Sequence, residues 1–61
     1  MYQMTFTDST TGRIETSRIL DSQRKAANWA KWLLTQSFAA EVSVYRGGAG
    51  GELVSRMVKA A

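Results

Sequence analysis

A single long stretch of this sequence, from Ser22 to about Phe38, repeats apolar residues at the period of an α-helix. Asp21 and Ser22 precede it as two candidate N-caps. The predicted apolar arc of this helix consists of Ala26, Trp29, Ala30, Leu33, Leu34 and Ser37. Because an apolar arc must be buried against another element, the fold has to place one helix on whatever sheet the remaining residues form.

The residues before the helix predict two strands. Residues 2–7 alternate apolar and polar side chains, which is the period of a half-buried strand. The turn formers between Asp8 and Gly12 close a hairpin, since Asp bonds its own backbone and Gly adopts positive φ. Residues 13–19 alternate less regularly and carry scattered charges, so we expect an edge strand there.

The residues after the helix allow two interpretations. Residues 41–46 are a β-rich run, followed by a glycine loop at 47–51 and a segment at 52–61 whose apolar residues recur at helical spacing. A hairpin closed through the glycine loop instead pairs opposite charges and β-branched residues across the strands. The pairs in that register are Arg46 with Glu52, Val44 with Val54, and Ser43 with Ser55. We prefer a strand for the last segment and keep a helix as the alternative.

These elements predict one α+β domain over residues 1–61 with the order ββαββ, a four-stranded sheet carrying a single helix on one face. A helical C-terminal segment would change the order to ββαβα. The core expected beside the helix arc contains Met4, Phe6, Ile14, Val42, Val44 and Val54. Three apolar residues then point to the other sheet face and form a candidate dimer interface, namely Tyr45, Leu53 and Met57.

The size of the chain also favours a dimer. A chain of 61 residues buries only about 60% of the surface that its unfolded form exposes, so its stability is marginal. Disulfides and the usual zinc sites are excluded because the sequence contains no cysteine and no histidine. Oligomerisation is the remaining support for so small a protein, and a homodimer is the expected state. The alternative is a well-packed monomer, since domains of about this length also fold alone.

The composition argues against an enzyme. Without histidine or cysteine, a serine nucleophile has no usual base and a covalent cysteine mechanism is impossible. The five carboxylates are not spaced to share a helix face, and we predict no cofactor and no metal. The glycine loop lacks the Gly-Lys-Ser/Thr ending of a phosphate-binding loop, although a helix beginning after it would strengthen an anion-binding hypothesis.

Trp32 is the strongest functional signal. Its position on the polar border of the helix gives a large aromatic ring no evident structural role. With its helix neighbours it predicts a partner-binding site made of Arg24, Lys25, Asn28, Lys31 and Trp32. The structural alternative is that Trp32 folds over the sheet edge and is buried.

A protein is the preferred partner, because Trp and Arg are enriched in interface hot spots. Nucleic acid is the alternative, with Trp32 stacking on bases and the cations contacting phosphates. The net charge of +3 is mild, so the clustering of cations decides between the two. Nucleic acid gains if the helix cations and the hairpin cations Arg46 and Arg56 share one face, and protein gains if carboxylates lie among them.

The N-terminus has no basic region followed by an apolar stretch, and no run of residues is long enough for a membrane span, so we expect a cytoplasmic protein without membrane contact. In size and composition the chain resembles small proteins of phages and mobile elements, which often bind and block a host protein. This resemblance implies an inhibitor or regulator and assigns no residue.

Overall fold

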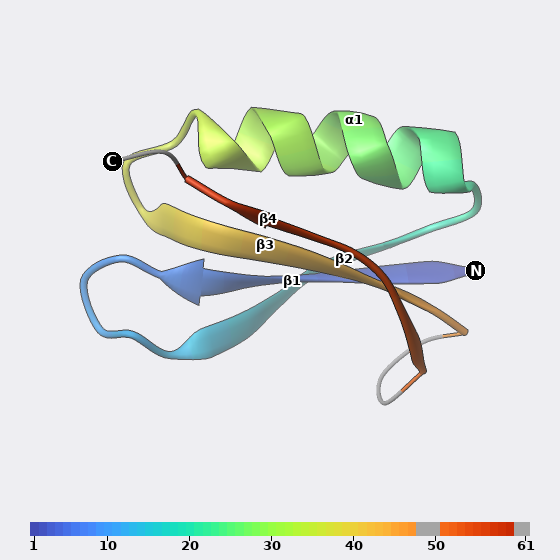
Figure 1. Cartoon of the computed structure of the whole chain (residues 1–61), viewed down its shortest axis with the longest axis horizontal. Helices are drawn as coiled ribbons and strands as arrows, with labels where there is room; N and C mark the ends of the chain where they lie inside the picture. The colour runs from blue at the N-terminus through green and yellow to red at the C-terminus, as the bar shows by residue number, and fades with distance from the viewer. Residues whose placement is uncertain (48–50, 60–61) are drawn as a thin grey trace.

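The computed structural model describes residues 1–47 and 51–59, which form a four-stranded antiparallel sheet and one helix (Figure 1). The strands are β1 (Tyr2–Asp8), β2 (Ile14–Leu20), β3 (Ala39–Arg46) and β4 (Glu52–Val58), and the helix is α1 (Gln23–Leu34). Their order across the sheet is β2-β1-β3-β4. The predicted ββαββ architecture is therefore confirmed, with β2 at an edge, and the helical alternative for the C-terminal segment is wrong.

The helix begins where the sequence predicts and ends earlier. Ser22 is the N-cap, and its hydroxyl accepts a hydrogen bond of 3.1 Å from the backbone N–H of Lys25. The helix stops at Leu34, not near Phe38, because the Thr35 hydroxyl donates to the carbonyl oxygen of Trp32 in a tightened last turn. Phe38 then packs edge-to-face on Phe6, with ring centroids 5.5 Å apart.

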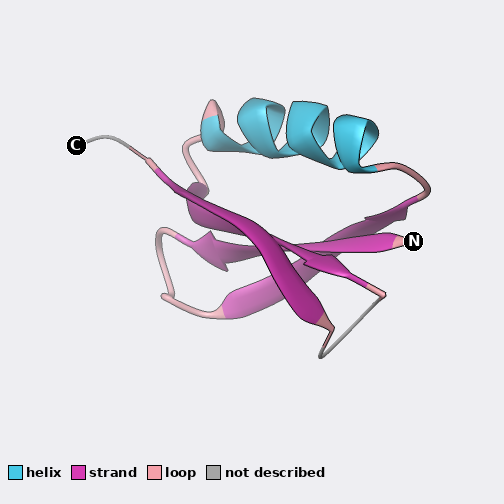
Figure 2. Cartoon of the chain, turned by 45° about the vertical axis from the view of Figure 1, so that its right-hand side comes forward, coloured by secondary structure: helices cyan, strands magenta, loops and turns pink. Residues whose placement is uncertain are grey.

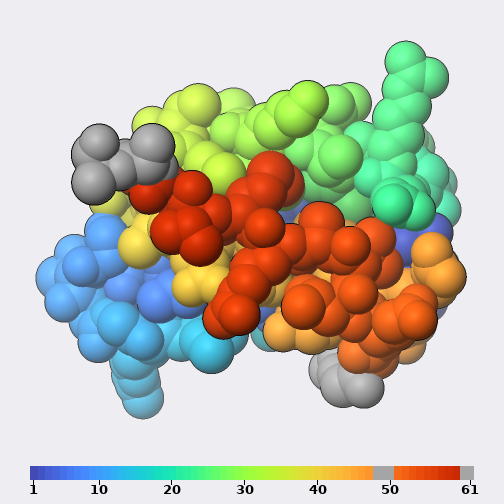
Figure 3. Space-filling view, viewed as in Figure 1, coloured from blue at the N-terminus to red at the C-terminus, as the bar shows by residue number. Residues whose placement is uncertain are grey.

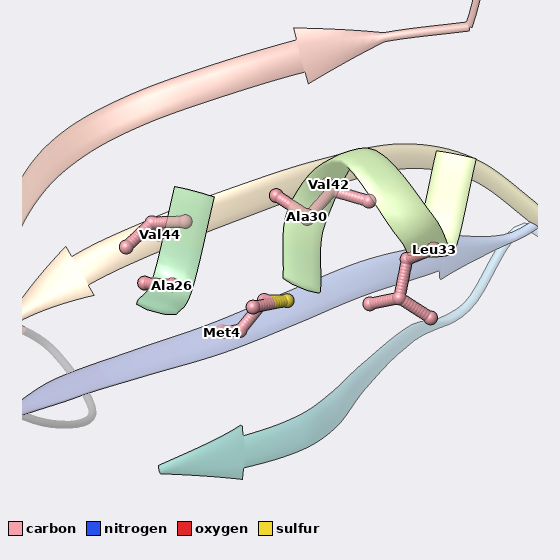
Figure 4. Packing of buried hydrophobic residues seen from close by; sticks show 6 residues of the cluster. All are labelled: Met4, Ala26, Ala30, Leu33, Val42 and Val44. Carbon is pink, nitrogen blue, oxygen red and sulfur yellow. The ribbon is translucent and has the colours of Figure 1, made fainter. Parts of the chain in front are cut away.

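The core lies between α1 and the two central strands (Figure 4). Met4, Val42 and Val44 are buried on the sheet, and the small side chains of Ala26 and Ala30 allow the helix to approach them closely. Leu33 completes the buried cluster, and the partly buried residues around it are Tyr2, Phe6, Leu20, Leu34, Val54 and Met57. Figure 2 shows α1 on one side of the twisted sheet, and no other described element covers the opposite side.

A register shift in β2 changes which side chains face the helix. Arg18 lies opposite Met4 and Thr16 lies opposite Thr5, so Ser17 is an extra residue. A bulge of this kind reverses the alternation of side chains on the strand. Ile14, which the sequence assigned to the core, consequently points away from the helix and is 74% exposed.

A second register shift, in β4, makes the pairing of β3 with β4 differ from the predicted one. Arg46 lies opposite Glu52 as expected, but Val44 pairs with Ser55 and leaves Val54 as the extra residue. The predicted Val44–Val54 and Ser43–Ser55 pairs are therefore wrong. Met57, predicted at the dimer interface, lies opposite Val42 and packs against the core. In the space-filling view, β4 crosses the middle of the molecule and borders α1 (Figure 3).

The sheet face without a helix, here called the uncovered face, follows from the strand register. Its side chains form three cross-strand rows. The rows are Ile19, Gln3, Tyr45 and Leu53; Thr16, Thr5, Ser43 and Arg56; and Ile14, Thr7, Glu41 and Val58. Tyr45 and Leu53 thus lie side by side on this face, as the sequence predicted.

Candidate functional site

Two tryptophans and an asparagine form an aromatic corner on the exposed surface of α1. The rings of Trp29 and Trp32 meet edge-to-face, with centroids 5.4 Å apart and planes at 82°. Asn28 lies beside them, and the three residues line an open hollow of about 380 Å³. We call Asn28, Trp29 and Trp32 the Trp corner.

Trp32 is exposed, as the helical period predicts. Half of its surface, 50%, is accessible to solvent, so the alternative in which it folds under the sheet edge is wrong. Its spacing of three residues from Trp29 places both rings on the same side of the helix. The contact between the rings limits the motion of a side chain that would otherwise be free in water.

Trp29 does not lie in the core, where the sequence placed it. Its side chain is 36% exposed and is not part of the buried cluster. The reason is the position of the helix, which packs mainly over β3 and β1 and only slightly over β2. The Trp29 side of the arc therefore overhangs the edge strand β2 rather than a full sheet.

Arg18 on β2 contacts the overhanging ring. It lies opposite the buried Met4 and so points to the helix side of the sheet. Its guanidinium carbon is 4.1 Å from the centroid of the Trp29 ring, within the range of a cation–π interaction. Arg18 was not among the predicted site residues, because alternation along a strand does not show which helix residue lies over it.

The predicted cations of the site all lie on α1, namely Arg24, Lys25 and Lys31. Lys25 forms an ion pair of 3.2 Å with Asp21, which precedes the helix by two residues. Arg24 and Lys31 are exposed and make no ion pair with any described residue. Helical spacing puts Arg24 and Lys31 in one stripe with Asn28, next to the two tryptophans of the Trp corner.

The two hairpin cations are paired with carboxylates, and they lie on opposite faces of the sheet, Arg46 on the helix side and Arg56 on the uncovered face. Arg46 pairs with Glu52 at 3.3 Å. Arg56 pairs with Glu41 on the uncovered face. Each of these arginines therefore has a carboxylate beside it. The clustering that would favour nucleic acid, with the helix cations and both hairpin cations on one face, is not present among these residues.

The described residues add no support for anion binding by the glycine loop. The glycine-loop hypothesis falls on residues 48–50, outside the described residues, and Glu52 begins a strand rather than the helix that would strengthen it. Within residues 1–47 and 51–59, no three carboxylates are close enough to hold a metal ion. The described part of the chain has no helix with the length and apolar character needed to cross a membrane.

Comparison of this chain with known proteins finds no relative. No family model matches the sequence, and neither a curated protein nor a solved structure matches the chain.

Proposed function

We propose that this chain is a small non-catalytic binding module that engages a protein partner through the Trp corner and acts as its inhibitor or regulator. The observation that carries the proposal is the exposed, perpendicular pair of Trp29 and Trp32. Tryptophan is enriched among the few residues that dominate the energy of protein interfaces. Its large ring supplies apolar contact while its N–H offers one hydrogen bond.

The aromatic corner is preorganised, which supports a binding role. Arg18 covers one face of the Trp29 ring, and Trp32 contacts Trp29 edge-to-face. A partner that binds such a corner loses less side-chain entropy than one that must order free side chains. Asn28 at the same hollow offers both a hydrogen-bond donor and an acceptor to a partner's backbone.

The geometry favours a protein over nucleic acid. Successive bases stack on exposed aromatic faces, but rings at 82° do not present two parallel faces to one stack of bases. The arginines of the β3–β4 hairpin are each paired with a carboxylate, Arg46 with Glu52 and Arg56 with Glu41, and Arg56 lies on the uncovered face. A corner of two perpendicular rings suits an aliphatic or aromatic side chain that contacts both of them.

An affinity purification from the native host tests this function. The tagged chain, its Trp32→Ala variant and a Thr10→Ala control are compared by quantitative mass spectrometry after nuclease treatment. Thr10 serves as the control because it is exposed in the turn between β1 and β2, outside the helix and outside the uncovered face. A partner should be retained by the wild type and the control and lost by Trp32→Ala. Retention that depends on undigested nucleic acid would contradict the proposal.

The uncovered face supports the second part of the proposal, a homodimer. Four large apolar side chains on this face are strongly exposed, namely Ile14, Ile19, Leu53 and Val58. The cations and carboxylates there are balanced, since Glu41 pairs with Arg56, so two copies would not repel each other strongly. Two such sheets can pack face to face with their strands nearly aligned. Tyr45 and Leu53 remain in the proposed interface, and Met57 does not belong to it.

A further inference from the structure

The charge of the molecule is concentrated around the Trp corner. Four of the eight cations lie on α1 or beside Trp29, and two carboxylates accompany them, Asp21 before the helix and Glu15 on the helix side of β2. These four cations are Arg18, Arg24, Lys25 and Lys31. These four cations and two carboxylates carry a net charge of +2, which is most of the formal net charge of +3.

This charge selects the chemistry of the partner. We infer that the Trp corner binds an acidic segment of a protein partner, with one large apolar side chain seated in the hollow against both Trp29 and Trp32. The inference rests on the proposed function and specifies its ligand. Charge complementarity of this kind raises the association rate and suppresses partners of the wrong sign.

The hollow limits how much of the partner enters. Its volume of about 380 Å³ accommodates a side chain and adjacent backbone rather than a folded surface. The Asn28 amide lies at the hollow and is positioned for the backbone of the inserted segment. Because Arg18 already covers one face of Trp29 with a positive charge, a cationic anchor would be repelled.

The spacing of the helix cations predicts a pattern in the ligand. Arg24 and Lys31 lie on either side of Asn28 along the helix, separated by about 10 Å at a rise of 1.5 Å per residue. An extended segment advances about 3.3 Å per residue, so carboxylates about three residues apart would reach both cations. The expected ligand therefore has two acidic residues that flank an apolar anchor.

A selection from phage-displayed random peptides on the immobilised full chain tests this pattern. Enriched peptides should carry two carboxylates around a large apolar residue and should lose binding to Trp32→Ala. Enrichment of neutral or basic peptides that still require Trp32 would overturn the acidic ligand while leaving the proposed function intact. If no enriched peptide depends on Trp32, or none is enriched, both the ligand and the proposed function fail.

Affinity measurements on one enriched peptide sharpen the test. Replacing both of its acidic residues by their amides should weaken binding about tenfold, as should the double variant Arg24→Gln/Lys31→Gln. The matched control is Arg13→Gln/Arg46→Gln, which removes the same charge from residues that neither belong to α1 nor line the hollow and should leave affinity nearly unchanged. Equal weakening by both double variants would show only a general charge effect and overturn the inference. The inference would also be overturned if single-stranded oligothymidine bound to Arg24 and Lys31 more tightly than the enriched peptide does.

Discussion

The guanidinium carbon of Arg18 lies 4.1 Å from the centroid of the Trp29 ring, so an edge-strand cation holds the exposed flank of the helix. The two residues come from β2 and α1, and the helix packs much less on β2 than on β3 or β1. Arg18 therefore supports Trp29, and through the ring contact it also supports Trp32. The position of the binding residues depends on a strand that does not itself form the hollow.

Replacing Arg18 tests this support. Arg18→Ala should lower the free energy of unfolding by about 1 kcal/mol, because the cation–π contact and its packing are lost. Urea denaturation followed by circular dichroism measures the change, and tryptophan emission should also shift. Arg13→Ala is the control, since it removes an exposed arginine from the hairpin and should change stability by less than about 0.5 kcal/mol. Equal losses for both variants would contradict a specific Arg18–Trp29 contact.

The two tryptophans should respond differently to truncation. Trp29→Ala should cost about 2 kcal/mol of folding stability, because a partly buried ring and its contact with Arg18 disappear. Trp32→Ala should cost less than about 1 kcal/mol, since half of this side chain is already in water. Partner binding should nevertheless weaken by about 2 kcal/mol or more in Trp32→Ala if this residue is a hot spot.

Thermal unfolding and titration with the isolated partner measure these two quantities separately. Trp32→Phe provides a control that keeps an aromatic ring and should retain part of the affinity. The hot-spot assignment fails if Trp32→Ala binds like the wild type, or if it unfolds as easily as Trp29→Ala.

The helical period predicted the buried side of α1 well but placed Trp29 wrongly. Ala26, Ala30 and Leu33 are buried as their spacing indicates. The period describes the helix alone and does not say where the helix lies over the sheet. Because α1 is centred over β3 and β1, the residue on the β2 side of the arc lies over an edge and stays exposed.

The prediction from strand alternation failed at the bulges in β2 and β4 for a related reason. One extra residue, Ser17 in β2 and Val54 in β4, reverses the faces of the residues on one side of it. Ile14 therefore points away from the helix, and Met57 points toward it. Neither bulge has a glycine to mark it in the sequence, so a period of two could not reveal them.

Binding of single-stranded DNA distinguishes the preferred partner class from its alternative. We expect no quenching of tryptophan fluorescence by oligothymidine at about 150 mM salt, because only Arg24 and Lys31 of the helix cations are unpaired among the described contacts. A titration at about 50 mM salt, where release of counterions favours binding most, is the stringent condition. Affinity that falls linearly with the logarithm of salt and disappears in Trp32→Ala would instead establish the nucleic-acid function.

Light scattering at micromolar concentration tests the homodimer, for which we expect a mass twice the 6.7 kDa of the chain. Leu53→Lys should dissociate the dimer, because an unpaired charge buried in an apolar interface costs several kcal/mol. The monomer should still fold, since Leu53 is 50% exposed within one chain and its replacement leaves the core intact. Gln23→Lys adds the same charge on the helix side and should remain dimeric, which separates burial at the interface from simple repulsion. A wild-type mass of one chain would refute the dimer, and dissociation by Gln23→Lys would show that the uncovered face is not the interface.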